Sequence, residues 1–133
     1  MAVDSVHIGV GKWLKRQLEF RNEQRMIGSI RDVARPTEKD VVAVVDHLVE
    51  ENAMNYGFIL SKCTPGAVEL LRAVAAERVV AEPMSAEFGR KYGLRAASSV
   101  RFALDSLLDD ELLYRREDGY VVYDRLFAEW LRT

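Results

Sequence analysis

The amino-acid sequence predicts a mainly α-helical protein with one small β-hairpin, and the C-terminal half carries the evidence. Apolar residues recur there at i, i+3, i+4, i+7 and i+8, the spacing of a stripe on one helical face: Val100, Ala103, Leu104, Leu107 and Leu108. Two β-prone runs follow at 112–117 and 120–123, and Asp118-Gly119 between them is the signal of a type I′ turn. With a short helix before them, these elements predict a winged helix-turn-helix.

The preceding residues, 1–62, read as a separate helical segment. Val6, Ile8 and Val10 alternate with polar or small residues, which favours a brief strand or an ordered arm at residues 1–10. Helical spacing over 13–34 predicts either one long helix or two helices broken near 20–22. Thr37 with Asp40 then forms a capping-box pattern before a helix at 41–54.

The apolar run at 41–45 predicts that this second helix is buried on more than one face. The polar residues at 52–57 loosen the helical pattern. We therefore expect the helix to end near Met54, with residues 56–60 packing as a connector.

The winged helix-turn-helix is predicted over residues 63–133, and its elements have clear start and stop signals. Thr64 and Pro65 begin a helix at 65–77, and an extended link at 78–83 follows. Ser85 caps a second helix that ends at Gly93. The third helix begins at Ala97 or Ser98. A last short helix over 124–131 turns its apolar residues inward: Leu126, Phe127, Trp130 and Leu131.

The bulk composition limits the class of protein. The 133 residues, 49% of them hydrophobic, suffice for a packed core. No apolar run approaches the roughly 20 residues of a membrane span, and residues 1–10 lack the apolar core of a signal peptide. We therefore expect a cytoplasmic protein with no membrane partner. The single cysteine, Cys63, excludes an internal disulfide and a cysteine-based metal cage.

Charge is divided unevenly along the chain. Residues 12–35 hold seven basic and three acidic side chains, a net of +4, so the remainder carries −6 of the total of −2. The predicted winged half is therefore acidic, which is unfavourable for binding phosphates.

The sequence offers no residue set for catalysis, for a cofactor or for a metal. The letters Gly9-Val10-Gly11-Lys12 resemble a phosphate-binding loop, but that motif needs a glycine at position 6 and a hydroxyl at position 13, where Val6 and Trp13 stand. The two histidines, His7 and His47, form no metal motif. We expect the acids at 109–111 to be a solvated helix end. Ser98 and Ser99 have no neighbouring base, so we expect cap or first-turn roles for them.

Nucleic-acid binding is the functional alternative that the fold raises. In a winged helix the third helix enters the major groove and the wing reaches the backbone. The residues placed to make such contacts, or contacts with a protein partner, are Arg95, Ser98, Ser99, Arg101, Arg115 and Arg116. Between positions 95 and 118 these four arginines are outnumbered by six acids, so we expect DNA binding to be weak.

Three motifs of the C-terminal half resemble one protein family. They are P-x-S-x-E-F at 83–88, L-x-x-x-S-S-V-x-x-A-L-x-x-L-L at 94–108 and G-Y-V-V-Y-D-R-L-F-A-E-W-L at 119–131. Together they resemble the C-terminal region of prokaryotic AAA-type P-loop ATPases of archaea and bacteria, where a helical lid and a winged helix follow the nucleotide domain. The resemblance is dense over 63–132, looser over 36–60 and absent over 1–35, and the Walker A lysine and Walker B acids have no counterpart here.

The resemblance implies a non-catalytic regulatory or interaction module, preceded by a lid-like helical segment. Its partner would be a P-loop ATPase domain, in cis or in trans, with weak DNA contact as a further expectation. ATP and Mg²⁺ would bind only to that parent domain, so this chain is expected to hold no cofactor. The alternative is a winged-helix DNA-binding transcription regulator, whose helical N-terminal half would form an oligomer by serving as a dimerisation element.

Overall fold

The computed structural model describes the backbone of residues 2–31, 35 and 37–133, and the side chains of residues 15–31, 35 and 37–133. The chain divides into two compact units, Met1–Ile59 and Leu60–Thr133. The first is called the helical hairpin below and the second the winged unit. Each is described by itself.

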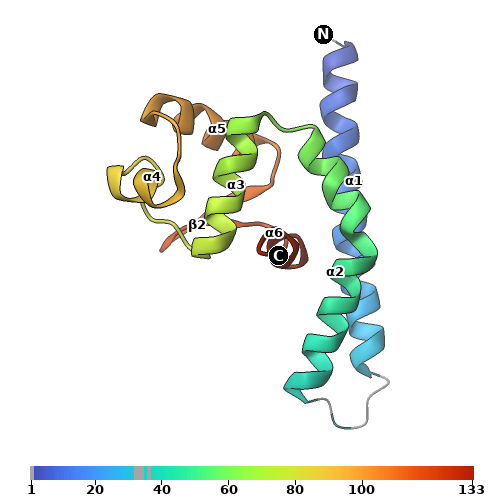
Figure 1. Ribbon diagram of the computed structural model, residues 1–133. Coiled ribbons are helices and arrows are strands. Elements are labelled where there is room, and N and C mark those ends of the chain that lie inside the picture. The colour runs from blue at the N-terminus through green and yellow to red at the C-terminus, as the bar shows by residue number, and fades with distance from the viewer. Residues whose placement is uncertain (1, 32–34, 36) are drawn as a thin grey trace. The chain divides into compact units, whose positions relative to one another are not determined.

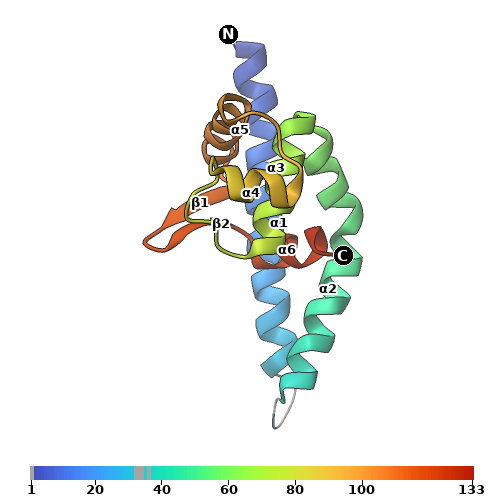
Figure 2. The ribbon, with the colours of Figure 1, turned by 60° about the vertical axis from the view of Figure 1, so that its left-hand side comes forward.

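The helical hairpin consists of α1 (Ala2–Arg31) and α2 (Glu38–Ser61), which lie side by side and run antiparallel (Figures 1 and 2). Among the hairpin side chains that the structure describes, the buried apolar ones are Leu18, Leu48, Val49, Tyr56 and Ile59. Thr37 caps α2 as predicted: its hydroxyl accepts from the Asp40 amide at 3.3 Å, and the Asp40 carboxylate accepts from the Thr37 amide at 2.8 Å. Pro36, which stands between the two helices in the sequence, lies outside the described residues.

The prediction of a strand or arm at the N-terminus is wrong for residues 2–10, which form the first turns of α1. Three alternating apolar residues without a partner strand cannot form a ladder, whereas a continuing helix satisfies their backbone groups. Of the two alternatives for 13–34, the structure has one helix that is unbroken through 20–22.

The predicted end of the second helix near Met54 is also wrong, because α2 continues to Ser61 and includes the supposed connector. Asn52 does not break it, because its side-chain amide donates to the carbonyl of Leu48 at 2.7 Å and finds further partners on α1. The prediction that 41–45 is buried on more than one face fails as well. Val41 and Val42 are exposed, since a two-helix hairpin offers α2 a single packing partner.

The winged unit has the predicted order of elements: α3 (Pro65–Glu77), α4 (Ala86–Tyr92), α5 (Ala97–Asp109), β1 (Leu113–Arg116), β2 (Gly119–Val122) and α6 (Arg125–Leu131). Its helix signals are confirmed. Thr64 accepts from the Ala67 amide and Ser85 from the Phe88 amide, both at 3.2 Å, and Gly93 ends α4 in the left-handed conformation with φ 63°. The predicted mainly helical fold with one small antiparallel hairpin is therefore the observed one.

The turn of the β-hairpin is displaced by one residue from its prediction. Arg116 pairs with Gly119, so the two turn residues are Glu117 and Asp118, and neither has the positive φ that a type I′ turn requires. Gly119 has φ 142° and starts β2 instead. It is needed there for close approach, because a Cβ at this position would lie 2.5 Å from the carbonyl oxygen of Val80.

The link at 78–83 adds a third, short piece to this sheet. Val80 and Tyr120 exchange two backbone hydrogen bonds, of 3.0 and 2.8 Å. α3 lies at the centre of the unit, in contact with α5, α6 and β2. The predicted stripe on α5 is confirmed, with only Leu108 half-exposed, and the inward prediction for α6 holds for Leu126, Phe127 and Leu131. Trp130 is only half-buried, with its ring stacked on Phe127 at a centroid distance of 6.0 Å.

Candidate functional site

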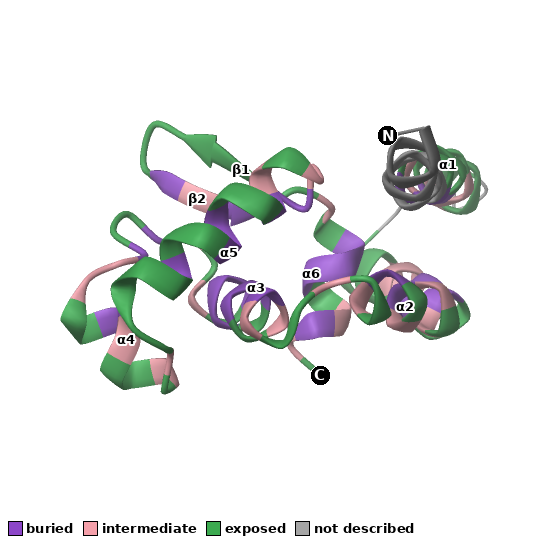
Figure 3. Cartoon of the chain, turned by 90° about the horizontal axis from the view of Figure 1, so that it is seen from above, coloured by how far each residue is buried: buried purple, intermediate pink, exposed green. Residues whose placement is uncertain are grey.

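The outer surface of α5 is the first candidate site, because this helix takes the position of the reading helix in a helix-turn-helix. Gly93 ends α4 and Ala96 begins α5 as its N-cap. The cap residue is an alanine with no hydrogen-bonding side chain, and Ser98 and Ser99 lie in the first turn, the second of the two roles expected for them. Figure 3 shows the buried side of α5 turned toward α3 and its exposed side turned outward.

The outward side of α5 carries one large apolar residue among polar ones. Its exposed side chains beyond the first residue are Ser98, Ser99, Arg101, Phe102, Asp105, Ser106 and Asp109. Phe102 is 73% exposed and lies in the middle of this surface. Phe102 is not among the contact residues predicted from the sequence. Its exposure could have been predicted, because helical periodicity places it outside the buried face formed by Val100, Ala103 and Leu104. Burial of such a ring is worth most when it fills a pocket on a protein partner.

Three of the four arginines at this candidate site are ion-paired within the winged unit. Arg101 lies 3.5 Å from Asp105 one turn further along α5, and Arg116 lies 3.0 Å from Asp118 at the wing tip. The guanidinium of Arg95 pairs with Glu69 at 3.2 Å and lies against the start of α3, where its side chain approaches Gly66. Arg95 is thereby directed away from the outer surface of α5.

The fourth arginine, Arg115, lies over the ring of Tyr120 at 5.9 Å. The strand register places Arg115 on the sheet face of Tyr120 and Arg116 on the opposite face. Two exposed tyrosines also lie on the wing: Tyr114 and Tyr123 pack edge to face with ring centroids 5.4 Å apart. The six predicted contact residues are therefore exposed, but only Ser98, Ser99 and Arg101 share one helical surface.

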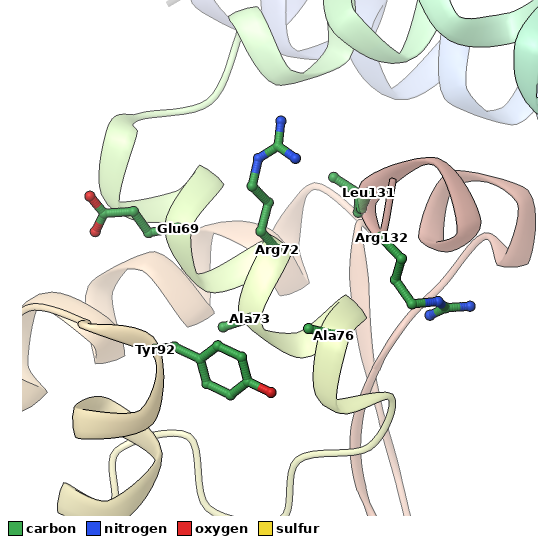
Figure 4. Close-up of a pocket in the computed structure, with 7 residues that line it drawn as sticks. All are labelled: Glu69, Arg72, Ala73, Ala76, Tyr92, Leu131 and Arg132. Carbon is green, nitrogen blue, oxygen red and sulfur yellow. The ribbon is translucent and has the colours of Figure 1, made fainter.

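A shallow pocket of about 610 Å³ lies between α3, the end of α4 and the end of α6 (Figure 4). Its polar side chains hold the fold together. Arg132 donates to the carbonyl of Ala75 at 2.9 Å and pairs with Glu129, and Arg72 lies 5.9 Å from the ring of Trp130. Tyr92 donates its hydroxyl proton to Glu77, and this bond, with help from Lys91, holds the pKa of the Glu77 carboxyl below its ordinary value. No nucleophile with an adjacent base lines this pocket.

A reactive cysteine, a metal site or a membrane-spanning helix would each indicate a function for the described part of the chain. Burial raises the pKa of the Cys63 thiol, with a smaller contribution from Asp110, which disfavours the reactive thiolate. Among the residues whose side chains are described, no three His, Cys, Asp or Glu lie close enough together to hold a metal ion. Of the described helices, none is sufficiently long and apolar to span a bilayer.

Comparison with protein families finds a match over the C-terminal part of the chain. Residues 54–133 match the model of a family described as "Probable winged helix domain". These residues cover the end of α2 and the whole winged unit. Searches of curated proteins and of solved structures give no match.

Proposed function

Because the chain belongs to this winged helix family, we propose that it is a non-catalytic regulatory module whose winged unit contacts a protein rather than reading DNA. Following the sequence resemblance, the partner is the P-loop domain of a prokaryotic AAA-type ATPase, in cis or in trans. One observation carries the proposal: three of the four arginines at the candidate site are already paired with acids of the same unit.

A DNA phosphate that binds these arginines would have to replace the carboxylates that already pair with them. DNA affinity comes largely from the counterions released when Lys and Arg neutralise phosphates. Here Arg95, Arg101 and Arg116 must first leave Glu69, Asp105 and Asp118, and each released carboxylate then repels the DNA. Asp109 adds a further negative charge on the outer side of α5. A protein partner meets no such penalty and gains the burial of Phe102.

The second candidate, a DNA-binding regulator, is favoured by the exposure of Ser98, Ser99 and Arg101 in the first two turns of α5. Reading helices contact base edges with residues at their N-terminal end. We therefore test DNA binding directly by fluorescence anisotropy on random duplex DNA at several salt concentrations. About three neutralised phosphates give a slope of log K against log salt of roughly −3, compared with steeper slopes for dedicated DNA-binding proteins.

A charge-matched pair of variants tests the stated cause. Glu69→Gln, Asp105→Asn and Asp118→Asn together release the three arginines, and this triple variant should bind DNA measurably more tightly than the parent. The control, Glu23→Gln, Asp46→Asn and Glu50→Gln, makes the same change in net charge with exposed acids of the helical hairpin. Equal gains in both variants would show that net charge alone limits DNA binding. Nanomolar DNA affinity of the parent at physiological salt, lost in Arg101→Ala, would establish the regulator instead.

The ATPase part of the proposal has its own tests. Calorimetric titration of this chain with Mg-ATP should give no heat of binding, because it lacks the glycine and hydroxyl of a phosphate loop at positions 6 and 13. The genomic reading frame upstream of Met1, and the neighbouring genes, should encode a P-loop domain. Their lack of one would remove the proposed partner and leave the winged helix assignment intact.

A further inference from the structure

The outer side of α1 presents two large apolar residues seven positions apart. Phe20 is 65% and Ile27 51% exposed, and both face away from the side on which Leu18 and Asn22 are buried. With the exposed side chains of Glu23 and Gln24 between them, they occupy positions i, i+3, i+4 and i+7 of the helix. Four residues at this spacing form the hole that receives one side chain of a facing helix in knobs-into-holes packing.

The outer side of α5 supplies a side chain of the matching kind. Phe102 projects from the middle of this helix, and the residues one turn before and after it are the small Ser98 and Ser106. A lone exposed ring between small neighbours is a knob that a facing helix can approach closely.

The charges beside the knob and the hole are complementary. Asp109 lies seven residues beyond Phe102, about 10.5 Å along α5. Arg16 and Arg31 lie on either side of the α1 hole, each about 11 Å from its middle. Asp109 therefore meets an arginine whichever way the two helices run. A pairing of α1 with a second α1 would instead bring basic segments together, since residues 12–35 carry +4.

We propose that the chain self-associates through these two helices, with Phe102 of one copy seated between Phe20 and Ile27 of a second copy. Two such contacts related by a two-fold axis give a closed dimer. One helix pair per contact is a small interface, so the dimer is in micromolar equilibrium with the monomer and weakens as salt rises. This goes beyond the proposed function, which does not require self-association. Because both contacts use Phe102, a bound ATPase domain and a second copy would compete for this side chain.

Sedimentation equilibrium of the whole chain tests the proposal. The parent should show a monomer–dimer equilibrium, and Phe102→Ala should raise the dissociation constant by about tenfold or more, the effect of removing an interface anchor. Met54→Ala is the matched control, because Met54 is 90% exposed on α2 and lies outside the contact. Both variants should keep the parent's melting temperature at concentrations where the chain is monomeric, since each side chain is solvent-exposed.

Charge reversal tests the register. Asp109→Arg should weaken the dimer, because it places an arginine opposite Arg16 or Arg31. Combining it with Arg16→Glu should restore the dimer if Arg16 faces Asp109, and combining it with Arg31→Glu should restore the dimer if Arg31 does. The proposed contact would be overturned if neither double variant restored the dimer. It would also be overturned if the chain were monomeric at all concentrations, or if Phe102→Ala left the dissociation constant of the dimer unchanged. If α1 and α5 crosslink only within a monomer, the side chain seated between Phe20 and Ile27 belongs to the same chain, and the proposed contact with a second copy is wrong. None of these results changes the DNA and Mg-ATP measurements that test the proposed function.

Discussion

In the winged unit the fully buried side chains are apolar, whereas in the helical hairpin asparagines share the interior with leucine and tyrosine. The first set is Leu70, Leu71, Val74, Pro83, Leu104, Leu107, Leu113 and Phe127, and the second is Asn22, Leu48, Asn52 and Tyr56. Six elements can enclose a core, but two helices can shield only the line along which they touch. The hairpin therefore depends more on hydrogen bonds in its interior, and the winged unit depends more on the burial of apolar side chains.

The hydrogen bonds inside the hairpin form one connected set. The Asn52 amide donates to the Asn22 oxygen at 3.1 Å, and Arg21 donates to the Asn52 oxygen at 2.9 Å. Asn22 donates in turn to the hydroxyl of Tyr56 at 3.4 Å. Because each group has a partner only in one alignment of α1 and α2, the network fixes the register of the hairpin.

The largest expected effect tests the apolar core of the winged unit. Phe127→Ala should destabilise it by about 3–5 kcal/mol, because the ring is fully buried and leaves a cavity. Trp130→Ala should cost clearly less, since Trp130 is half-exposed and its ring lies against Phe127 and near the Arg72 guanidinium rather than inside the core. Urea denaturation of both variants measures the difference. Equal losses would show that Trp130 belongs to the core in solution.

Replacing one glycine by alanine in each unit tests where the fold requires a residue without a Cβ atom. Gly119→Ala should destabilise the winged unit by about 3 kcal/mol, because the new Cβ would meet the Val80 backbone and the residue would keep a positive φ. Gly57→Ala in α2 should stabilise the hairpin by about 0.5–1 kcal/mol, since no atom lies within 4 Å of its Cβ position. Thermal melts with residue-level hydrogen exchange assign each change to its unit. Tolerance of Gly119→Ala would contradict the observed contact between β2 and Val80.

The polar interior of the hairpin is tested by Asn52→Ala. It should destabilise the hairpin by about 2 kcal/mol, because the side-chain oxygen of Asn22 and the guanidinium of Arg21 lose their hydrogen bonds to Asn52. Asn55→Ala is the control on the same helix, at a half-exposed position where little change is expected. Amide exchange should quicken in α1 and α2 and stay unchanged in α3 and α5. Faster exchange in all four helices would mean that the two units unfold together.

The smallest expected effect is on the pH dependence of stability, through the hydrogen bond from Tyr92 of α4 to Glu77 of α3. Since the folded pKa of Glu77 is lowered, first by its hydrogen bond from Tyr92, its stabilising contribution is present above the unfolded pKa and is lost as pH falls through the folded one. Tyr92→Phe should lower the melting temperature slightly at neutral pH, and the gap should close in acid as the pH falls through the lowered pKa of the folded state. Tyr114→Phe, on the exposed wing, is the control. A gap that persists in acid would indicate lost packing rather than a lost hydrogen bond.

Features that depend on local interactions could be predicted from the amino-acid sequence. Thr37, Thr64 and Ser85 cap helices with groups that lie within three residues, and Gly93 ends α4 because it adopts the left-handed conformation at little cost. The stripe of α5 follows from helical periodicity alone. These signals were enough for the winged helix-turn-helix and for the exposed positions of Ser98, Ser99 and Arg101.

Features that depend on residues far apart in the chain could not be predicted in this way and become visible only in the folded protein. α2 continues through Asn52 because that side chain finds Asn22, 30 residues earlier, and Asp118-Gly119 is not the turn because Val80 requires the glycine next to it. Arg95 is paired with Glu69, 26 positions away on α3, so counting charges over 95–118 could not show that it points elsewhere. A local pattern contains no information about such partners, since folding brings them together only when the helices pack.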